Sequence, residues 1–202
     1  GGGMGTGLQA QDLTADDFGG PQFEGCNELL VVTKPEAIAQ IHASYFEVGC
    51  DVAETDTFGA FGVPLAEYDI AERAYELNVA AARVAKDVAT DFSTPDHPRW
   101  VSGSVGPGTK APSLGQIGFV ELRDLYDVQM RGLLDGGVDL IIIETQFDLL
   151  CVKAAMIAAR RAMGTTGRQV PIQVQVTIET TGRMLLGTEI GAALATIDPL
   201  RP

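Results

Sequence analysis

The stretch Val138–Asp148, VDLIIIETQFD, decides the fold expected for this sequence. Four aliphatic residues at 140–143 run without interruption into Glu144, which is typical of a strand buried on both faces. Helical patterns flank it at 119–137 and 149–164. A continuous apolar strand between two helices predicts a parallel sheet with helices packed outside it.

The same alternation extends in both directions from this strand. The pattern predicts a helix at 33–49, opened by a capping box from Thr33 to Glu36, and a long alanine-rich helix at 65–92. It also predicts strands within 50–60, 99–110 and 170–182, and a helix that begins near 187. The order of these elements is that of repeated strand and helix units.

Polar residues follow each expected strand, at 54–57, 102–104, 144–146 and 177–180. Ligands bind at this end of the strands in a (βα)8 barrel and in a doubly wound open sheet, so the feature alone leaves both open. The lack of a dinucleotide fingerprint favours the barrel. Four strands are half of a barrel, so we expect a partial (βα)8 TIM-type barrel of about strands 2 to 5, lacking the first and last strands.

In this interpretation the opening GGGMGTGLQ is a loop that follows an absent first strand, and the chain is cut at both ends. Its 202 residues form a single, incomplete domain over 1–202. Open sheet edges would then favour self-association as a homo-oligomer.

Composition excludes several classes of partner. The formal charge of −13 opposes binding to nucleic acid, and no apolar run or leader pattern indicates a membrane span or secretion. Three scattered cysteines, Cys26, Cys50 and Cys151, form no disulfide framework. We therefore expect a cytoplasmic protein.

Few residues suggest chemistry by themselves. Glu144 leaves an apolar strand at the ligand end, where a site role and a structural role are evenly weighted. Glu54 and Thr55 should face opposite ways, so that only one points inward. The cysteines lie too far apart for zinc, and His42 and His97 are expected in structural or solvent-exposed roles.

Six strings taken together are more specific. These are GGMGT, DFGG…EGCNELL, TKPEAIAQIHASYFEVGCDVAETDTFGA, GSVGPGTK, GGVDLIIIETQFD…VKAA and TIETTGRMLLGTE. In this order the sequence resembles, over its whole length, the amino-terminal homocysteine-binding domain of cobalamin-dependent methionine synthases, in the homocysteine S-methyltransferase family.

The resemblance implies a (βα)8 barrel that binds homocysteine, whose thiolate takes a methyl group from methylcobalamin. It implies zinc held by three late cysteines outside this chain, and partner domains for folate, cobalamin and reactivation. Carried over by position, the substrate-binding residues are Gly2, Gly3, Thr55 and Glu144. No catalytic residue, metal ligand or bound cofactor is expected in this chain, which would be inactive alone.

The sequence also departs from the family pattern. Gly1 stands where the family usually has aspartate, Asp56 where it has asparagine and Gln146 where it often has cysteine. Two alternatives remain: a homocysteine methyltransferase that uses betaine or S-methylmethionine, and a non-catalytic module that self-associates.

Overall fold

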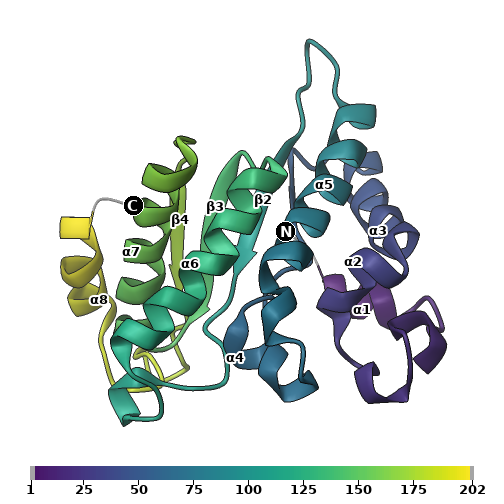
Figure 1. Cartoon of the computed structure of the whole chain (residues 1–202). Coiled ribbons are helices and arrows are strands. Elements are labelled where there is room, and N and C mark those ends of the chain that lie inside the picture. The colour runs from purple at the N-terminus through teal and green to yellow at the C-terminus, as the bar shows by residue number, and fades with distance from the viewer. Residues whose placement is uncertain (1–2, 201–202) are drawn as a thin grey trace.

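The computed structural model describes residues 3–200 of the chain. Four strands form one parallel sheet in the order β1-β2-β3-β4 (Figure 1). They span Val52–Glu54 (β1), Trp100–Val105 (β2), Leu140–Gln146 (β3) and Ile172–Val176 (β4). All four lie where the sequence predicts strands.

Three long helices connect the strands: α5 (Ala74–Phe92), α6 (Phe119–Gly136) and α7 (Leu149–Thr166). The other α-helices are α1 (Met4–Gln9), α2 (Leu30–Thr33), α3 (Pro35–Glu47), α4 (Gly62–Leu65) and α8 (Ile190–Ile197). Short 3₁₀ segments span Ala15–Phe18 (η1), Pro21–Phe23 (η2), Asn27–Leu29 (η3), Ala66–Tyr68 (η4), Ala71–Arg73 (η5), Pro112–Leu114 (η6) and Asp198–Leu200 (η7). None of the helices described over residues 3–200 combines the length and the apolar character needed to cross a membrane.

The strand order decides between the two architectures that the sequence left open. Each strand pairs in parallel with the next one in the chain, and the order never reverses. Because such crossovers are right-handed, successive steps in one direction place every connecting helix on the same face of the sheet. A doubly wound sheet reverses direction instead. The sheet is therefore a sector of a singly wound barrel.

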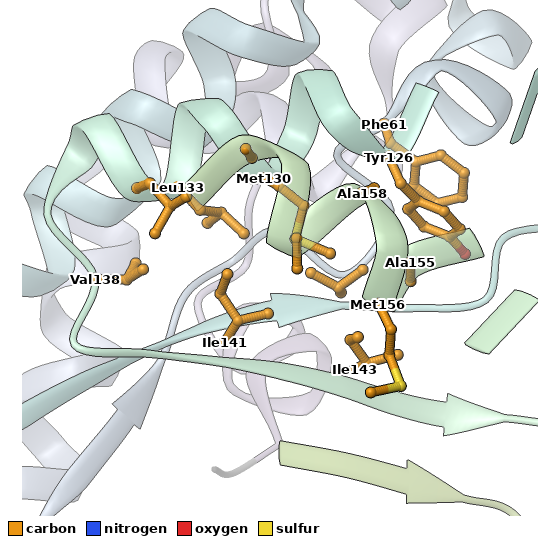
Figure 2. Packing of buried hydrophobic residues seen from close by; sticks show 14 of the residues in the cluster. Phe61, Tyr126, Met130, Leu133, Val138, Ile141, Ile143, Ala155, Met156 and Ala158 are labelled. Atoms are coloured by element: carbon orange, nitrogen blue, oxygen red, sulfur yellow. The ribbon is translucent and has the colours of Figure 1, made fainter. Parts of the chain in front are cut away.

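The helical face of the sheet carries the larger hydrophobic core. Val101, Val105, Ile141 and Ile143 point from β2 and β3 towards α6 and α7 and are fully buried. Figure 2 shows Ile141 and Ile143 facing Met130 and Leu133 of α6 and Met156 of α7. Burial of these side chains, each contributing about 1.5–3 kcal/mol, fixes which face of each strand meets the helices.

The opposite face of the sheet is polar. The register pairs Glu54 with Ser102, and Ser104 with Ile142, so Glu144 lies two residues further along the same face as Ser104. On β4 the corresponding positions are exposed glutamines, Gln173 and Gln175. This face is the one that a closed barrel would turn inward.

A second core lies at the amino-terminal end of the described chain, where α1, α2 and α3 pack near α5. The opening segment, expected as a loop, forms the helix α1 from Met4, and its Leu8 is buried. Packing of this one apolar side chain outweighs the low helix propensity of the surrounding glycines.

Two helix starts also differ from the prediction. Thr33 is the last residue of α2 and its hydroxyl donates to Leu29 O, so the capping box with Glu36 is wrong. The helix expected over 65–92 starts at Ala74, because Asp69 adopts a left-handed conformation that interrupts it.

Candidate functional site

A cavity of about 300 Å³ opens at the carboxyl ends of β1, β2 and β3. Its walls come from α1, η3, α3 and the three strands. It is lined by Met4, Gly5, Asn27, Glu28, Ile41, His42, Tyr45, Val52, Ala53, Glu54, Thr55, Asp56, Phe58, Ser104 and Glu144. Among these described residues there are four carboxyl groups and no lysine or arginine.

Glu144 is held at one side of the cavity by the neighbouring strand. The hydroxyl of Ser104 on β2 donates to Glu144 Oε1 at 2.6 Å, and the Thr145 hydroxyl lies 3.4 Å from Oε2. Thr145 has a φ of 56°, unusual for a β-branched residue, at the point where the β3–β4 register shifts. The carboxylate is half-buried with acceptor capacity to spare, as a cation site requires.

Thr55 lines the cavity and also ties β1 to β2. Its hydroxyl accepts a hydrogen bond from Ser104 N at 3.0 Å and lies 2.6 Å from the Thr57 hydroxyl. Since Thr57 donates its own proton to Ser104 O, Thr55 is the donor between the two threonines. Thr55 thus has only a lone pair left for a ligand.

Glu54 faces the cavity rather than the helices, so the expected opposition of Glu54 and Thr55 does not hold. β1 ends at Glu54, and the period of two does not extend to the irregular backbone that follows. Burial, with the nearby negative charge of Glu144, raises the pKa of Glu54.

Asp56 is the most deeply placed carboxyl group of the cavity. It is 7% exposed, and its Oδ2 has no hydrogen-bond partner within the described chain. Burial, followed by the charge of Glu28, raises its pKa to about 8.

His42 was expected in a structural or solvent-exposed role, yet it lines the cavity from α3. It is 1% exposed, its Nε2 has no partner among the described residues, and burial lowers its pKa to about 4. The sequence did contain a signal: His42 lies four residues after Ile38 and one after Ile41, on the apolar stripe of its helix.

Of the two glycines predicted to contact substrate, Gly2 and Gly3, the structure describes Gly3. Gly3 donates its N–H to the Tyr45 hydroxyl at 2.8 Å, and the next residue, Met4, lines the cavity. Gly1 and Gly2 lie outside the described residues. Of the predicted set, the structure brings Thr55 and Glu144 together.

The described residues do not fit a zinc ion. No group of three or more histidine, cysteine, aspartate or glutamate side chains over residues 3–200 is arranged to hold a metal. Cys26 and Cys151 are buried, and burial raises the pKa of each thiol to about 12. A thiol of this kind stays protonated near neutral pH, whereas zinc binds thiolate.

Comparison with known sequences identifies the family of this chain. The family model described as homocysteine S-methyltransferase matches residues 1–202. Proteins named methionine synthase from Mycobacterium leprae and Mycobacterium tuberculosis are each 51% identical over 199 residues. The match covers 98% of this chain and 16% of each relative.

Solved structures support the barrel. The homocysteine methyltransferase MmuM from Escherichia coli, in its metallated form, superposes with a TM-score of 0.78 at 19% identity, over 98% of this chain and 69% of that one. Its apo form gives a TM-score of 0.70 and 65% coverage of that chain. The likeness confirms the prediction of a partial barrel.

Proposed function

Because this chain belongs to the homocysteine S-methyltransferase family, we propose that its cavity binds homocysteine as part of a methionine synthase. Residues 1–202 act as one incomplete barrel domain that receives the amino-acid end of the substrate. The activity belongs to a longer protein, since the chain spans only 16% of the length of its curated relatives.

The observation that carries the proposal is the position of Glu144. Its carboxylate is held by Ser104 in the wall of a cavity whose described lining includes four carboxyl groups and no lysine or arginine. A primary ammonium group, with three donors, suits such a set of acceptors. Glu144 would therefore receive the ammonium group of homocysteine.

The other predicted contacts have supporting roles. Thr55 offers one acceptor, and its main effect is to hold the end of β1 against Ser104. Tyr45 accepts the Gly3 N–H and keeps its own proton to donate towards the cavity. Gly2 and Gly3 stay predicted substrate contacts: the Gly3 N–H is already donated to Tyr45, and Gly2 lies outside the described residues.

The cofactors and partner domains belong to the proposed full-length protein. We propose methylcobalamin as the methyl donor, because the most similar sequences among those reported above are named methionine synthase. Donation from betaine or S-methylmethionine remains the alternative.

Domains for folate, cobalamin and reactivation would be the partners of this domain. The protein would lie in the cytoplasm, where the three free cysteines would stay reduced. Zinc ligands would come from outside this chain.

The test measures homocysteine binding to the 202-residue chain. Titration calorimetry or ligand-detected NMR, with homocysteine at millimolar concentrations, gives the affinity. We expect Glu144→Gln to weaken binding about 10- to 100-fold, because a charge-assisted hydrogen bond contributes about 1.5–3 kcal/mol. Glu121→Gln on the exposed surface of α6 is the matched control and should bind normally. Equal binding by both variants would refute the role of Glu144.

A further inference from the structure

The proposed contacts leave the most buried carboxyl group of the cavity unused. Asp56 follows β1 directly, is 7% exposed and lines the same cavity as Glu144. Its Oδ2 has no partner within the described chain, although buried polar atoms are nearly always hydrogen-bonded. Asp56 thus carries an oxygen with no partner among the described residues, in the wall of a cavity large enough for a small ligand.

The groups around Asp56 determine which form of the carboxyl group can exist there. Glu28 from η3, Glu54 from β1 and Glu144 from β3 are acidic, and Glu28 already accepts the Gly59 N–H at 2.8 Å. The remaining titratable groups near it are Cys26 before η3 and His42 and Tyr45 on α3, with Tyr68 and Arg73 next to Cys26. Arg73 is paired with Glu76, and burial holds the pKa of His42 at about 4, so Glu28 is the described charged group that acts on Asp56.

An ionised Asp56 would therefore be buried without a counter-charge, which is strongly unfavourable. Burial and Glu28 raise the pKa of Asp56 to about 8, so the group is mostly protonated at pH 7. A protonated carboxyl group has one O–H donor. An α-amino acid brings a carboxylate that needs donors, and the described lining offers few of them.

We propose that Asp56 is a neutral carboxylic acid whose O–H donates a hydrogen bond to the carboxylate of the bound amino acid. This inference rests on the proposed function, because it assumes that an amino acid occupies the cavity. Glu144 and Asp56 then divide the recognition: Glu144 takes the ammonium group and the neutral acid Asp56 takes the carboxylate. Deprotonation of Asp56 would replace that hydrogen bond with repulsion.

The test compares homocysteine binding by the wild-type chain, Asp56→Asn and Asp56→Ser at pH 6.5 and pH 9. Asparagine and serine are neutral donors at both values, whereas a group with a pKa of about 8 is only about one-tenth protonated at pH 9. We expect similar affinities at pH 6.5, and wild-type binding about tenfold weaker than that of Asp56→Asn at pH 9. The ligand titrates identically in each case, so the ratio isolates Asp56.

Asp91→Asn, at an exposed position near the end of α5, is the matched control and should follow the wild-type pH profile. Circular dichroism confirms that each variant is folded, and Asp56→Ser replaces Asp56→Asn if the latter is not. A wild-type to Asp56→Asn ratio that stays constant with pH would overturn the inference while Glu144-dependent binding persists. Absence of saturable binding in every variant would overturn the proposed function and the inference with it.

Discussion

His42 shows how a single buried side chain can make the stability of this chain depend on pH. The imidazole is 1% exposed, and burial lowers its pKa from the usual 6.5 to about 4. Above pH 6.5 it is neutral in the folded and the unfolded chain. As the pH falls towards 4, only the unfolded chain takes up the proton, so folding stability is lost across that window.

We predict that His42→Gln reduces the loss of stability between pH 6.5 and pH 4.5. A shift of about 2.5 pKa units corresponds to about 3 kcal/mol at its limit. Urea unfolding at the two pH values measures the effect. His97→Gln, which changes the other histidine of the sequence on an exposed loop, is the control and should leave this part of the acid sensitivity unchanged. Equal behaviour of the two variants would contradict the prediction.

At the scale of elements, the sequence predicts those features that burial repeats along the chain. The four strands and α5, α6 and α7 were predictable because apolar residues recur with the period of a strand or a helix. α1 was not, since its stability comes from packing of Leu8 and its local sequence is rich in glycine. The inward turn of Glu54 and the deep position of Asp56 depend on where β1 ends, which no periodicity specifies.

The packing of α5 against α6 provides a prediction at the same scale. Gly132 of α6 faces α5 so closely that an added Cβ would lie 2.7 Å from Tyr75 O and 2.8 Å from Asn78 Cβ. We expect Gly132→Ala to destabilise the chain by about 1–3 kcal/mol, because a helix backbone cannot move aside as a side-chain end can. Gly164→Ala on α7, where an added Cβ meets nothing within 4 Å, should be neutral or stabilising by up to about 1 kcal/mol.

Thermal unfolding of both variants tests this contrast, since the substitution and the gain in helix propensity are the same. A Gly132→Ala variant as stable as Gly164→Ala would show that α5 and α6 are not in close contact in solution. A lowered midpoint for Gly132→Ala alone would support the close approach of α6 to α5 at this position.

At the scale of the whole molecule, the sheet has two edges in the described chain, β1 and β4. The cavity lies beside β1, where α1 and α3 add to its walls, whereas β4 exposes Gln173 and Gln175. Exposed apolar side chains follow it in the chain, among them Ile178, Leu185 and Leu194. An uncharged strand edge beside exposed apolar groups promotes pairing with another chain.

We therefore predict that the chain forms dimers or larger assemblies through β4, and that Gln173→Lys combined with Gln175→Lys shifts it towards monomer in light scattering. The control, Gln9→Lys combined with Gln22→Lys, changes two exposed glutamines away from the sheet and adds the same two charges. The added charges lower the net charge of −13 in magnitude, which by itself favours association. A shift towards monomer in the β4 variant alone would therefore come from the position of its charges at the associating edge. A wild-type chain that is a monodisperse monomer with a cooperative melting transition would refute association altogether.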